Sequence, residues 1–117
     1  MKHVLLDTNF ILSCIRKKID FFEEIPLMGL SIIIPKQVIE EVQGISNSKP
    51  EAKLALKIIT KNEFKKITLH GNNVDNGIVN LAKENENYII ATLDKGIQGK
   101  IKNQKLIIRG EKKLEVV

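Results

Sequence analysis

The chain has 117 residues and a net charge of +5, with 43% hydrophobic and 28% charged residues. These proportions are typical of globular proteins and exclude a disordered, collagen-like or coiled-coil chain, and the length suits one domain over residues 1–117. The longest uncharged stretch, residues 25–35, is shorter than the roughly 18 apolar residues of a membrane helix, and the first residues do not resemble a signal peptide. The lone Cys14 excludes an internal disulfide and fits a small core residue. We therefore expect a cytoplasmic protein with no membrane partner.

Short apolar runs alternate with helical patterns along the chain. The expected strands are residues 3–6, 31–34, 65–69, 88–93 and 105–108, with 114–117 as an optional sixth. The expected helices are residues 8–17, 19–24 (closed by Pro26 and Gly29), 35–45 with Pro35 in the first turn, 51–63, 74–86 and 94–102. This alternation predicts the α/β class, as a three-layer α/β/α sandwich around a central, mainly parallel sheet.

Aspartate is used sparingly, at only four positions, and three of them suggest a site. Asp7 directly follows the first expected strand, Asp94 follows the strand at 88–93, and Asp75 lies in the first turn of a helix. Each alone would suit a helix cap. Because function in parallel sheets gathers beyond the carboxyl ends of the strands, the three together predict a shared acidic site.

A fourth acid comes from the helix that follows Pro35, where Glu40 and Glu41 are adjacent. The apolar residues of that helix define a buried face, and at about 100° per residue Glu40 falls opposite this face. Glu41 falls about a quarter turn from its centre, at the margin of the helix. We therefore expect Glu41 to join the site and Glu40 to be a surface charge.

Clustered carboxylates repel one another unless a cation lies among them. Oxygen ligands without a Cys or His cluster favour Mg²⁺ or Mn²⁺, and such ions can activate a water for attack on a phosphodiester. His3, His70 and the scattered serines show no triad pattern. The acids therefore predict hydrolysis that depends on a metal ion.

The basic residues gather near the C-terminus. Residues 95–113 contain seven basic residues and one acid, Glu111, whereas the rest of the chain is slightly acidic. A basic segment of this kind suits a phosphate backbone, although a solvated lysine-rich face has the same composition. The five scattered aromatic residues do not suit a base-stacking platform. We take Lys95, Lys100 and Lys102 as candidate RNA-binding residues.

Four segments resemble, in order and spacing, the acidic motifs of PIN-domain nucleases: VLLDTNFIL, IPKQVIEEV, VDNGIVNLA and YIIATLDKGIQGKI. The resemblance covers nearly the whole chain. It implies a PIN-like fold with the first strand beside the strand that carries Asp94, and a metal-dependent endoribonuclease that acts on single-stranded or structured RNA. The residues that it implies as catalytic and metal-binding are Asp7, Glu41, Asp75 and Asp94, supported by Thr8, Asn9 and Thr92. The ending LIIRGEKKLE is more similar to the archaeal and eukaryotic rRNA-processing branch than to the VapC toxins.

Two departures from the family pattern keep other functions open. Gly96 and Asn76 stand where many relatives carry a further acid, which puts a second metal position in doubt. The alternatives are a VapC-type toxin ribonuclease and a nuclease-inactive PIN-like module that binds RNA or protein. The corresponding protein partner would be an antitoxin or a ribosome-assembly factor. A receiver or phosphatase domain is disfavoured because no acidic pair stands beside Asp7 and no DxDxT motif occurs.

The helix at 51–63 suggests self-association. Its first apolar stripe, which would dock on the sheet, consists of Ala52, Ala55, Leu56 and Ile59. Leu54 and Ile58 lie on the opposite side, where they need a second partner, either another helix of the chain or a symmetry-related copy. The PIN resemblance favours a homodimer.

Overall fold

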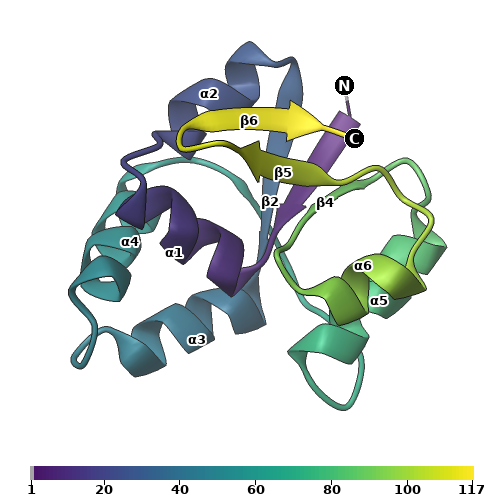
Figure 1. The fold of residues 1–117 in the computed structure, drawn as a ribbon. Helices are drawn as coiled ribbons and strands as arrows, with labels where there is room; N and C mark the ends of the chain where they lie inside the picture. The colour runs from purple at the N-terminus through teal and green to yellow at the C-terminus, as the bar shows by residue number, and fades with distance from the viewer. Residues whose placement is uncertain (1) are drawn as a thin grey trace.

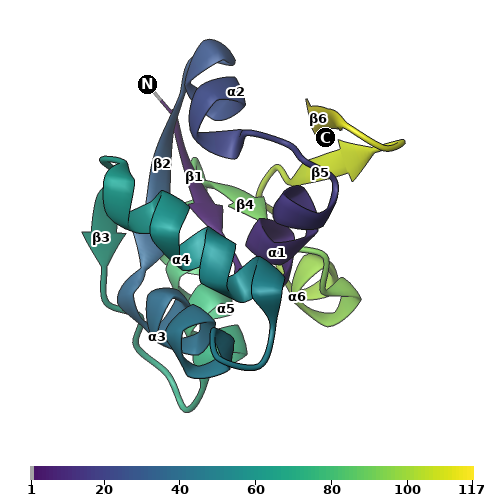
Figure 2. The same cartoon turned by 90° about the vertical axis from the view of Figure 1, so that its left-hand side faces the viewer.

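The computed structural model describes residues 2–117 (Figure 1). Its centre is a four-stranded parallel sheet in the order β3-β2-β1-β4 (Figure 2). The strands are β1 (Lys2–Leu6), β2 (Leu30–Pro35), β3 (Lys65–Ile67) and β4 (Ile89–Ala91). A separate antiparallel hairpin follows, made of β5 (Leu106–Arg109) and β6 (Lys113–Val116). A parallel bridge between Ile90 and Lys105 joins the start of this hairpin to β4. The expected mainly parallel sheet is therefore confirmed.

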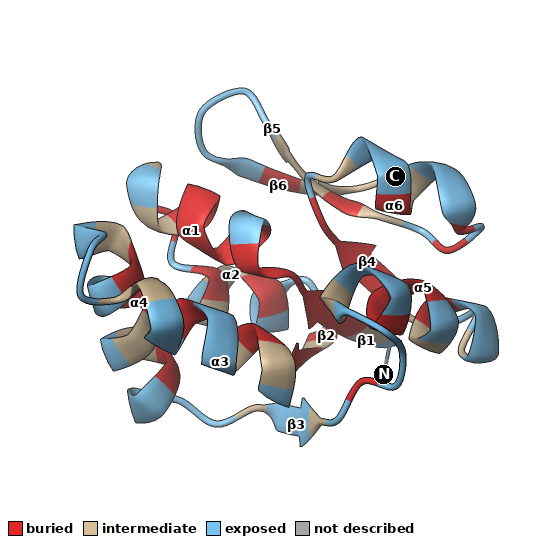
Figure 3. Cartoon of the chain, turned by 90° about the horizontal axis from the view of Figure 1, so that it is seen from below, coloured by how far each residue is buried: buried red, intermediate tan, exposed pale blue. Residues whose placement is uncertain are grey.

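Helices cover both faces of the sheet. They are α1 (Thr8–Arg16), α2 (Phe21–Leu27), α3 (Lys36–Ile45), α4 (Pro50–Lys61), α5 (Val74–Glu84) and α6 (Lys95–Lys100). On β1, Val4 and Leu6 belong to the core under α1 to α4, whereas Leu5 belongs to the core under α5 and α6. This alternation gives the three layers predicted from the sequence. Figure 2 looks onto α1, α3 and α4 with the sheet behind them, and Figure 3 shows buried residues concentrated in the sheet and on the helix faces that cover it.

The order of the strands determines where a site can form. The chain runs outward from β1 through β2 to β3 and then returns to β4 on the other side of β1. The reversal therefore falls between β1 and β4, where the crossing helices diverge and leave a crevice at the carboxyl ends of the strands. Asp7 directly follows β1, and its N–H donates to the Ala91 carbonyl oxygen at the end of β4, over 3.0 Å.

Several elements are shorter than predicted, because polar side chains end them early. The strand expected at residues 88–93 ends at Ala91, since the Thr92 hydroxyl accepts the Asp94 N–H in a turn. The helix expected to reach residue 86 ends at Glu84, because the Asn85 side chain donates to the Leu81 carbonyl oxygen. These local hydrogen bonds compete with continuation of the regular element.

The second helix differs in the opposite way. Pro26 was expected to close it but lies inside α2, which runs from Phe21 to Leu27. The helix ends at Leu27 with Met28 as its C-cap, and Gly29 follows with a φ of 78°, the left-handed conformation that commonly follows a helix. A proline costs a helix one hydrogen bond, but here the last turn is closed by the N–H of Met28, which donates to the Glu24 and Ile25 carbonyl oxygens.

Cys14 is a core residue, as expected. Its side chain is fully buried, and this burial, with a smaller contribution from the Glu24 charge, raises the pKa of the thiol to about 12. The thiolate is therefore disfavoured. No helix within residues 2–117 is both long and apolar enough to cross a bilayer.

Leu54 and Ile58, on the side of α4 opposite its first apolar stripe, have different environments. Ile58 is partly buried and packs against the core, whereas Leu54 is 49% exposed. Both line a cavity with Ile19 and Phe22, which belong to the α1–α2 connection and to α2. One of these two residues is therefore covered by the chain itself, and the other remains accessible.

Candidate active site

Asp7 is the most buried acid of the candidate site, with only 5% of its surface exposed. It is the N-cap of α1, and its Oδ1 accepts the N–H of Thr8 over 2.8 Å. Its Oδ2 accepts the hydroxyl of Thr92 over 2.9 Å. Both carboxylate oxygens are thus held, so the side chain has a fixed orientation at the end of β1.

Thr92 links the ends of β1 and β4. Its side chain is wholly buried, and besides donating to Asp7 its Oγ1 accepts the N–H of Asp94 over 3.1 Å. Asp94 is the N-cap of α6, and its Oδ1 accepts the N–H groups of Gly96 (2.7 Å) and Ile97 (3.1 Å). Among residues 2–117, no group donates a hydrogen bond to its other carboxylate oxygen. Capping therefore fixes Asp94 and leaves one oxygen for a ligand.

Gly96 has a local reason to be glycine. A Cβ at this position would lie 3.0 Å from Asp94 Oδ1, which is tighter than nine in ten real Cβ contacts. A larger residue would crowd the cap that holds Asp94.

Glu41 approaches the same site from α3. The Thr8 hydroxyl donates to Glu41 Oε1 over 2.6 Å, so one threonine lies between Asp7 and Glu41. Gln37 ties the first turn of α3 to Leu69, donating to its carbonyl oxygen over 2.9 Å and accepting its N–H over 3.0 Å. Glu40 does not line the cavity that contains Glu41. The structure therefore places the two glutamates as the helical periodicity predicted.

Asp75 completes the set from α5. The N-cap of this helix is Asn73, whose side chain accepts the Asn76 N–H, so Asp75 is not the cap. Gly77 lets the first turn of α5 pack closely on Leu69, because a Cβ there would lie 2.7 Å from the Leu69 side chain. Asp75 is exposed and lines the same cavity as the other three acids.

This cavity has a volume of about 490 Å³. It contains all four predicted acids together with Thr8 and Asn9, and its remaining lining residues are Leu12, Gly44, Ile45 and Lys49. Four segments that are distant in the sequence thus meet at the crevice between β1 and β4. Lys49 was not singled out from the sequence.

The cavity is electrostatically unfavourable for its own acids. Burial raises the pKa of Asp7 above its ordinary value, and the charges of Glu41 and Asp75 raise this pKa further. The hydrogen bonds from Thr92 and Thr8 lower the pKa of Asp7 and partly oppose these effects. Within residues 2–117 the only ion pair joins Arg109 and Glu115, so none of the four acids is paired with a basic residue. Such a site favours a bound cation.

The donor set suits a hydrated hard cation. All four side chains offer oxygen, and Mg²⁺ commonly keeps several waters and uses one or two direct carboxylates. Across residues 2–117, no three acidic, His or Cys side chains come close enough to enclose an ion directly. The residues therefore fit an ion that contacts some of the acids through water, and they do not form a closed protein cage.

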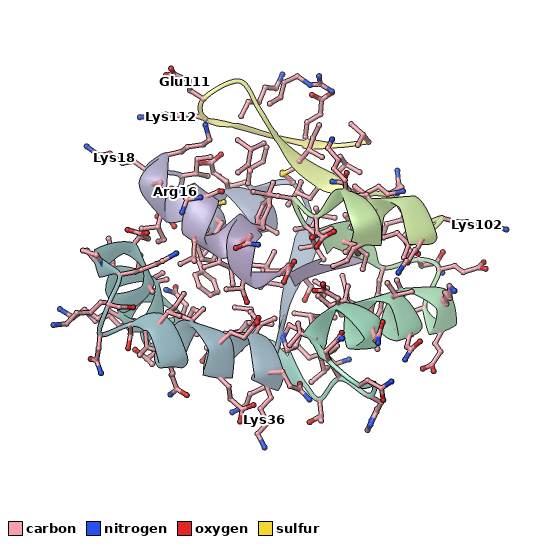
Figure 4. The ribbon with its side chains drawn as sticks, turned by 60° about the horizontal axis from the view of Figure 1, so that its bottom comes forward. Arg16, Lys18, Lys36, Lys102, Glu111 and Lys112 are labelled. Atoms are coloured by element: carbon pink, nitrogen blue, oxygen red, sulfur yellow. The ribbon has the colours of Figure 1, made fainter. Side chains whose placement is uncertain are left out.

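The three candidate RNA-binding lysines lie outside this cavity. Lys95 is exposed in the first turn of α6, next to Asp94. Lys100 and Lys102 line a separate hollow of about 260 Å³ together with Lys83, near the end of α5 that is remote from Asp75. In Figure 4 Lys102 projects outward on the side of the molecule away from α1 and α3. An RNA strand that contacts both the acidic cavity and these three lysines would have to extend beyond the cavity.

Comparison with known proteins agrees with this geometry. Residues 4–110 match the family described as "PIN like domain". The chain is 31% identical to ribonuclease VapC4 of Methanocaldococcus jannaschii, across 99% of this chain and 97% of that protein. It is 30% identical to the rRNA-processing protein fcf1 of Schizosaccharomyces pombe, across 86% of this chain and 53% of that protein.

A solved structure extends the likeness to three dimensions. The structure of the PIN domain endonuclease Utp24 superposes with a TM-score of 0.80 and 28% sequence identity, covering 97% of this chain and 90% of the other. The shared family, the shared sheet and the acids at its strand ends point the same way, and we conclude that this chain belongs to the PIN-like domain family.

Proposed function

We propose that this chain is a metal-dependent endoribonuclease that hydrolyses phosphodiester bonds of single-stranded or structured RNA. The observation that carries the proposal is the buried Asp7, held at the reversal point of the sheet in a cavity with three further unpaired acids. Relatives named as a ribonuclease, an rRNA-processing protein and a PIN domain endonuclease support the reaction class.

The residues would divide the work as follows. Asp7 and Asp94 are held by backbone and hydroxyl donors, so they would present oxygens at fixed positions, whereas Glu41 and Asp75 would close the site from α3 and α5. When bound, Mg²⁺ or Mn²⁺ would supply an activated water and neutralise charge on the leaving oxygen. Thr8 and Thr92 would fix the acids, and Asn9 at the cavity wall would contact the substrate.

Two cellular roles fit this activity. The similarity to fcf1 and Utp24 supports a role in rRNA processing, which would involve a ribosome-assembly partner in the cytoplasm. The nearly complete alignment with VapC4 supports a toxin role, which would involve an antitoxin. Depletion of an rRNA-processing enzyme should cause precursor rRNA to accumulate. A toxin should instead arrest growth when induced alone, and Asp7→Asn should relieve that arrest.

The activity itself is tested by incubating the protein with end-labelled RNA and DNA oligonucleotides of the same sequence. We expect internal cleavage of the RNA with Mn²⁺ or Mg²⁺, none with chelator, and little cleavage of the DNA. Binding of RNA without cleavage under every metal condition would support the nuclease-inactive alternative. Cleavage that persists in chelator would contradict metal dependence.

We also propose that the accessible part of α4 contributes to a homodimer. Leu54 is 49% exposed on the rim of an apolar cavity, where a second copy would cover it. Light scattering of the wild type and a Leu54→Glu variant tests this proposal. A dimer that becomes a folded monomer on substitution agrees with it, and a wild type that is monomeric at high concentration contradicts it.

A further inference from the structure

Lys49 is the only basic residue that lines the acidic cavity of the described chain. It lies on the α3–α4 connection and shares the cavity lining with Gly44 and Ile45 of α3. A lysine so near four carboxylates would be expected to pair with one of them. Within residues 2–117 its ammonium group makes no ion pair with any of these acids.

The connection that carries Lys49 is held in place by local hydrogen bonds. The N–H groups of Ser48 and Lys49 both donate to the Ile45 carbonyl oxygen, and the Ser48 hydroxyl donates to it as well. Pro50 begins α4 and disfavours the helical conformation for the residue before it, and Lys49 is extended, with φ −127° and ψ 118°. The backbone of Lys49 is therefore fixed at the cavity although its side chain is exposed.

The cavity lining combines the four acids with one basic residue and with residues that carry no charge. Gly44 and Ile45 lie three and four residues after Glu41 on α3, and Lys49 follows them on the connection to α4. Gly44 adds no side chain to this part of the lining, and a Cβ added to it would meet nothing within 4 Å. Leu12 is buried, but the partly exposed Ile45 beside a free ammonium group suits a nucleotide, which combines a nonpolar base face with a phosphate anion.

We propose that the part of the cavity lined by Gly44, Ile45 and Lys49 binds the nucleotide adjacent to the scissile phosphate, with the Lys49 ammonium on its phosphate. The proposal rests on the proposed ribonuclease function, because it places the neighbouring phosphodiester at the acids. It makes Lys49 a substrate-positioning residue. Its charge keeps the anionic strand in a cavity whose four carboxylates would otherwise repel it.

The first test measures RNA binding without cleavage. A fluorescent oligouridine is titrated with wild type, Lys49→Gln, Lys49→Arg and Lys53→Gln in chelator, between about 50 and 200 mM salt. Lys53 is the matched control, because it is exposed one turn further along α4 and lines no part of the cavity. We expect Lys49→Gln to weaken binding several-fold and to lower the log-log salt slope by about 0.7, the value for one phosphate contact on a single strand. Lys49→Arg should restore both quantities.

The second test measures whether this part of the cavity contributes to substrate binding or to the chemical step. In Mn²⁺, Lys49→Gln should raise KM for the RNA more than it lowers kcat, because the contact holds the substrate before and during the reaction. Gly44→Leu should also raise KM by placing a side chain in this part of the cavity, but it should leave the salt slope unchanged and the protein folded. Circular dichroism of both variants checks the fold.

The outcomes for the inference and for the function are distinct. Equal affinities and salt slopes for Lys49→Gln and Lys53→Gln, or a wild type that does not bind the RNA, would overturn the inference. A wild type that binds the RNA with the expected Lys49 dependence but never cleaves it would overturn the ribonuclease function and leave the binding site standing. Cleavage that is unaffected by Lys49→Gln would support the function and overturn the inference.

Discussion

The Thr92 hydroxyl donates a hydrogen bond to Asp7 Oδ2 across the junction of β4 and β1, at 2.9 Å and out of contact with solvent. The same hydroxyl accepts the N–H of Asp94, so one side chain positions two of the four acids. Because β1 and β4 are neighbours only through the returning chain, this contact joins residues separated by 85 positions.

Replacement of Thr92 by valine should destabilise the fold, because it leaves a buried Asp7 oxygen and the Asp94 N–H without a partner. We expect a loss of about 1–3 kcal/mol in the free energy of unfolding, measured by urea denaturation. Thr92→Ser, which keeps the hydroxyl, should lose less. Thr60→Val, at an exposed hydroxyl on α4, is the control and should be nearly neutral. A Thr92→Val variant as stable as the control would contradict the role given to this hydrogen bond.

The pH dependence of stability should reveal the burial of Asp7. Its pKa is raised above 3.8, chiefly by burial, so the folded state binds this proton more tightly than the unfolded state does. The stabilising contribution of protonated Asp7 is present below pH 3.8 and is lost as the pH rises through the folded-state pKa. In chelator, the stability of Asp7→Asn relative to wild type should therefore increase over that interval and then level off.

Divalent cations should stabilise the wild type relative to Asp7→Asn. Mn²⁺ or Mg²⁺ should raise the melting temperature of the wild type and have little effect on Asp7→Asn, since an ion that binds only the folded state stabilises it. Thermal denaturation of both proteins, with chelator and with each metal, checks the two statements. In chelator, a stability of Asp7→Asn relative to wild type that does not change with pH would show that burial does not raise the pKa of Asp7.

The adjacent pair Glu40 and Glu41 provides a matched comparison within one helix. Glu41→Gln should reduce RNA cleavage by at least about tenfold, because it removes a carboxylate from the cavity and a charge from the proposed metal site. Glu40→Gln makes the same chemical change outside the cavity and should cleave at nearly the wild-type rate. The measurement is the initial rate in Mn²⁺ at saturating RNA. The opposite order of activities would overturn the assignment of Glu41.

Helical periodicity was sufficient to predict that Glu41, and not Glu40, lines the cavity. The apolar residues of a helix determine which face it buries and therefore where each neighbouring side chain points. The positions of Asp7 and Asp94 were also predictable, since parallel strands end at the same edge of a sheet. The fold class followed from the alternation of strands and helices, and the structure confirms it.

The parts that were not predicted depend on contacts between distant segments or on local polar competition. Lys49 reaches the cavity only because the α3–α4 connection folds back on Ile45, and no periodic signal describes such a path. The early end of β4 depends on the Thr92 hydroxyl, and the position of Pro26 inside α2 depends on how its last turn is closed. A charge count also could not show that Lys100 and Lys102 line a different hollow from the acids.

Lys100 and Lys102 should still contribute to binding if a long RNA passes from the cavity over α6. The double variant Lys100→Gln/Lys102→Gln should weaken binding to all sequences alike and flatten the salt slope for a long RNA. It should have little effect on a short oligonucleotide that only fills the cavity. Lys65→Gln/Lys66→Gln, which removes the same charge from β3, is the control. Equal salt slopes for the two double variants would show that Lys100 and Lys102 do not contact the RNA and are solvated surface charges.

The most direct measurement is the rate of RNA cleavage in Mn²⁺ by wild type, Asp7→Asn and Asp20→Asn, each purified in the same way. Asp20 caps α2 outside the acidic cavity, so its substitution makes the same chemical change away from the proposed site. The account predicts that wild type and Asp20→Asn cleave alike, whereas Asp7→Asn remains folded and loses at least about a hundredfold in rate. Equal cleavage by all three proteins would contradict the assignment of the active site to Asp7.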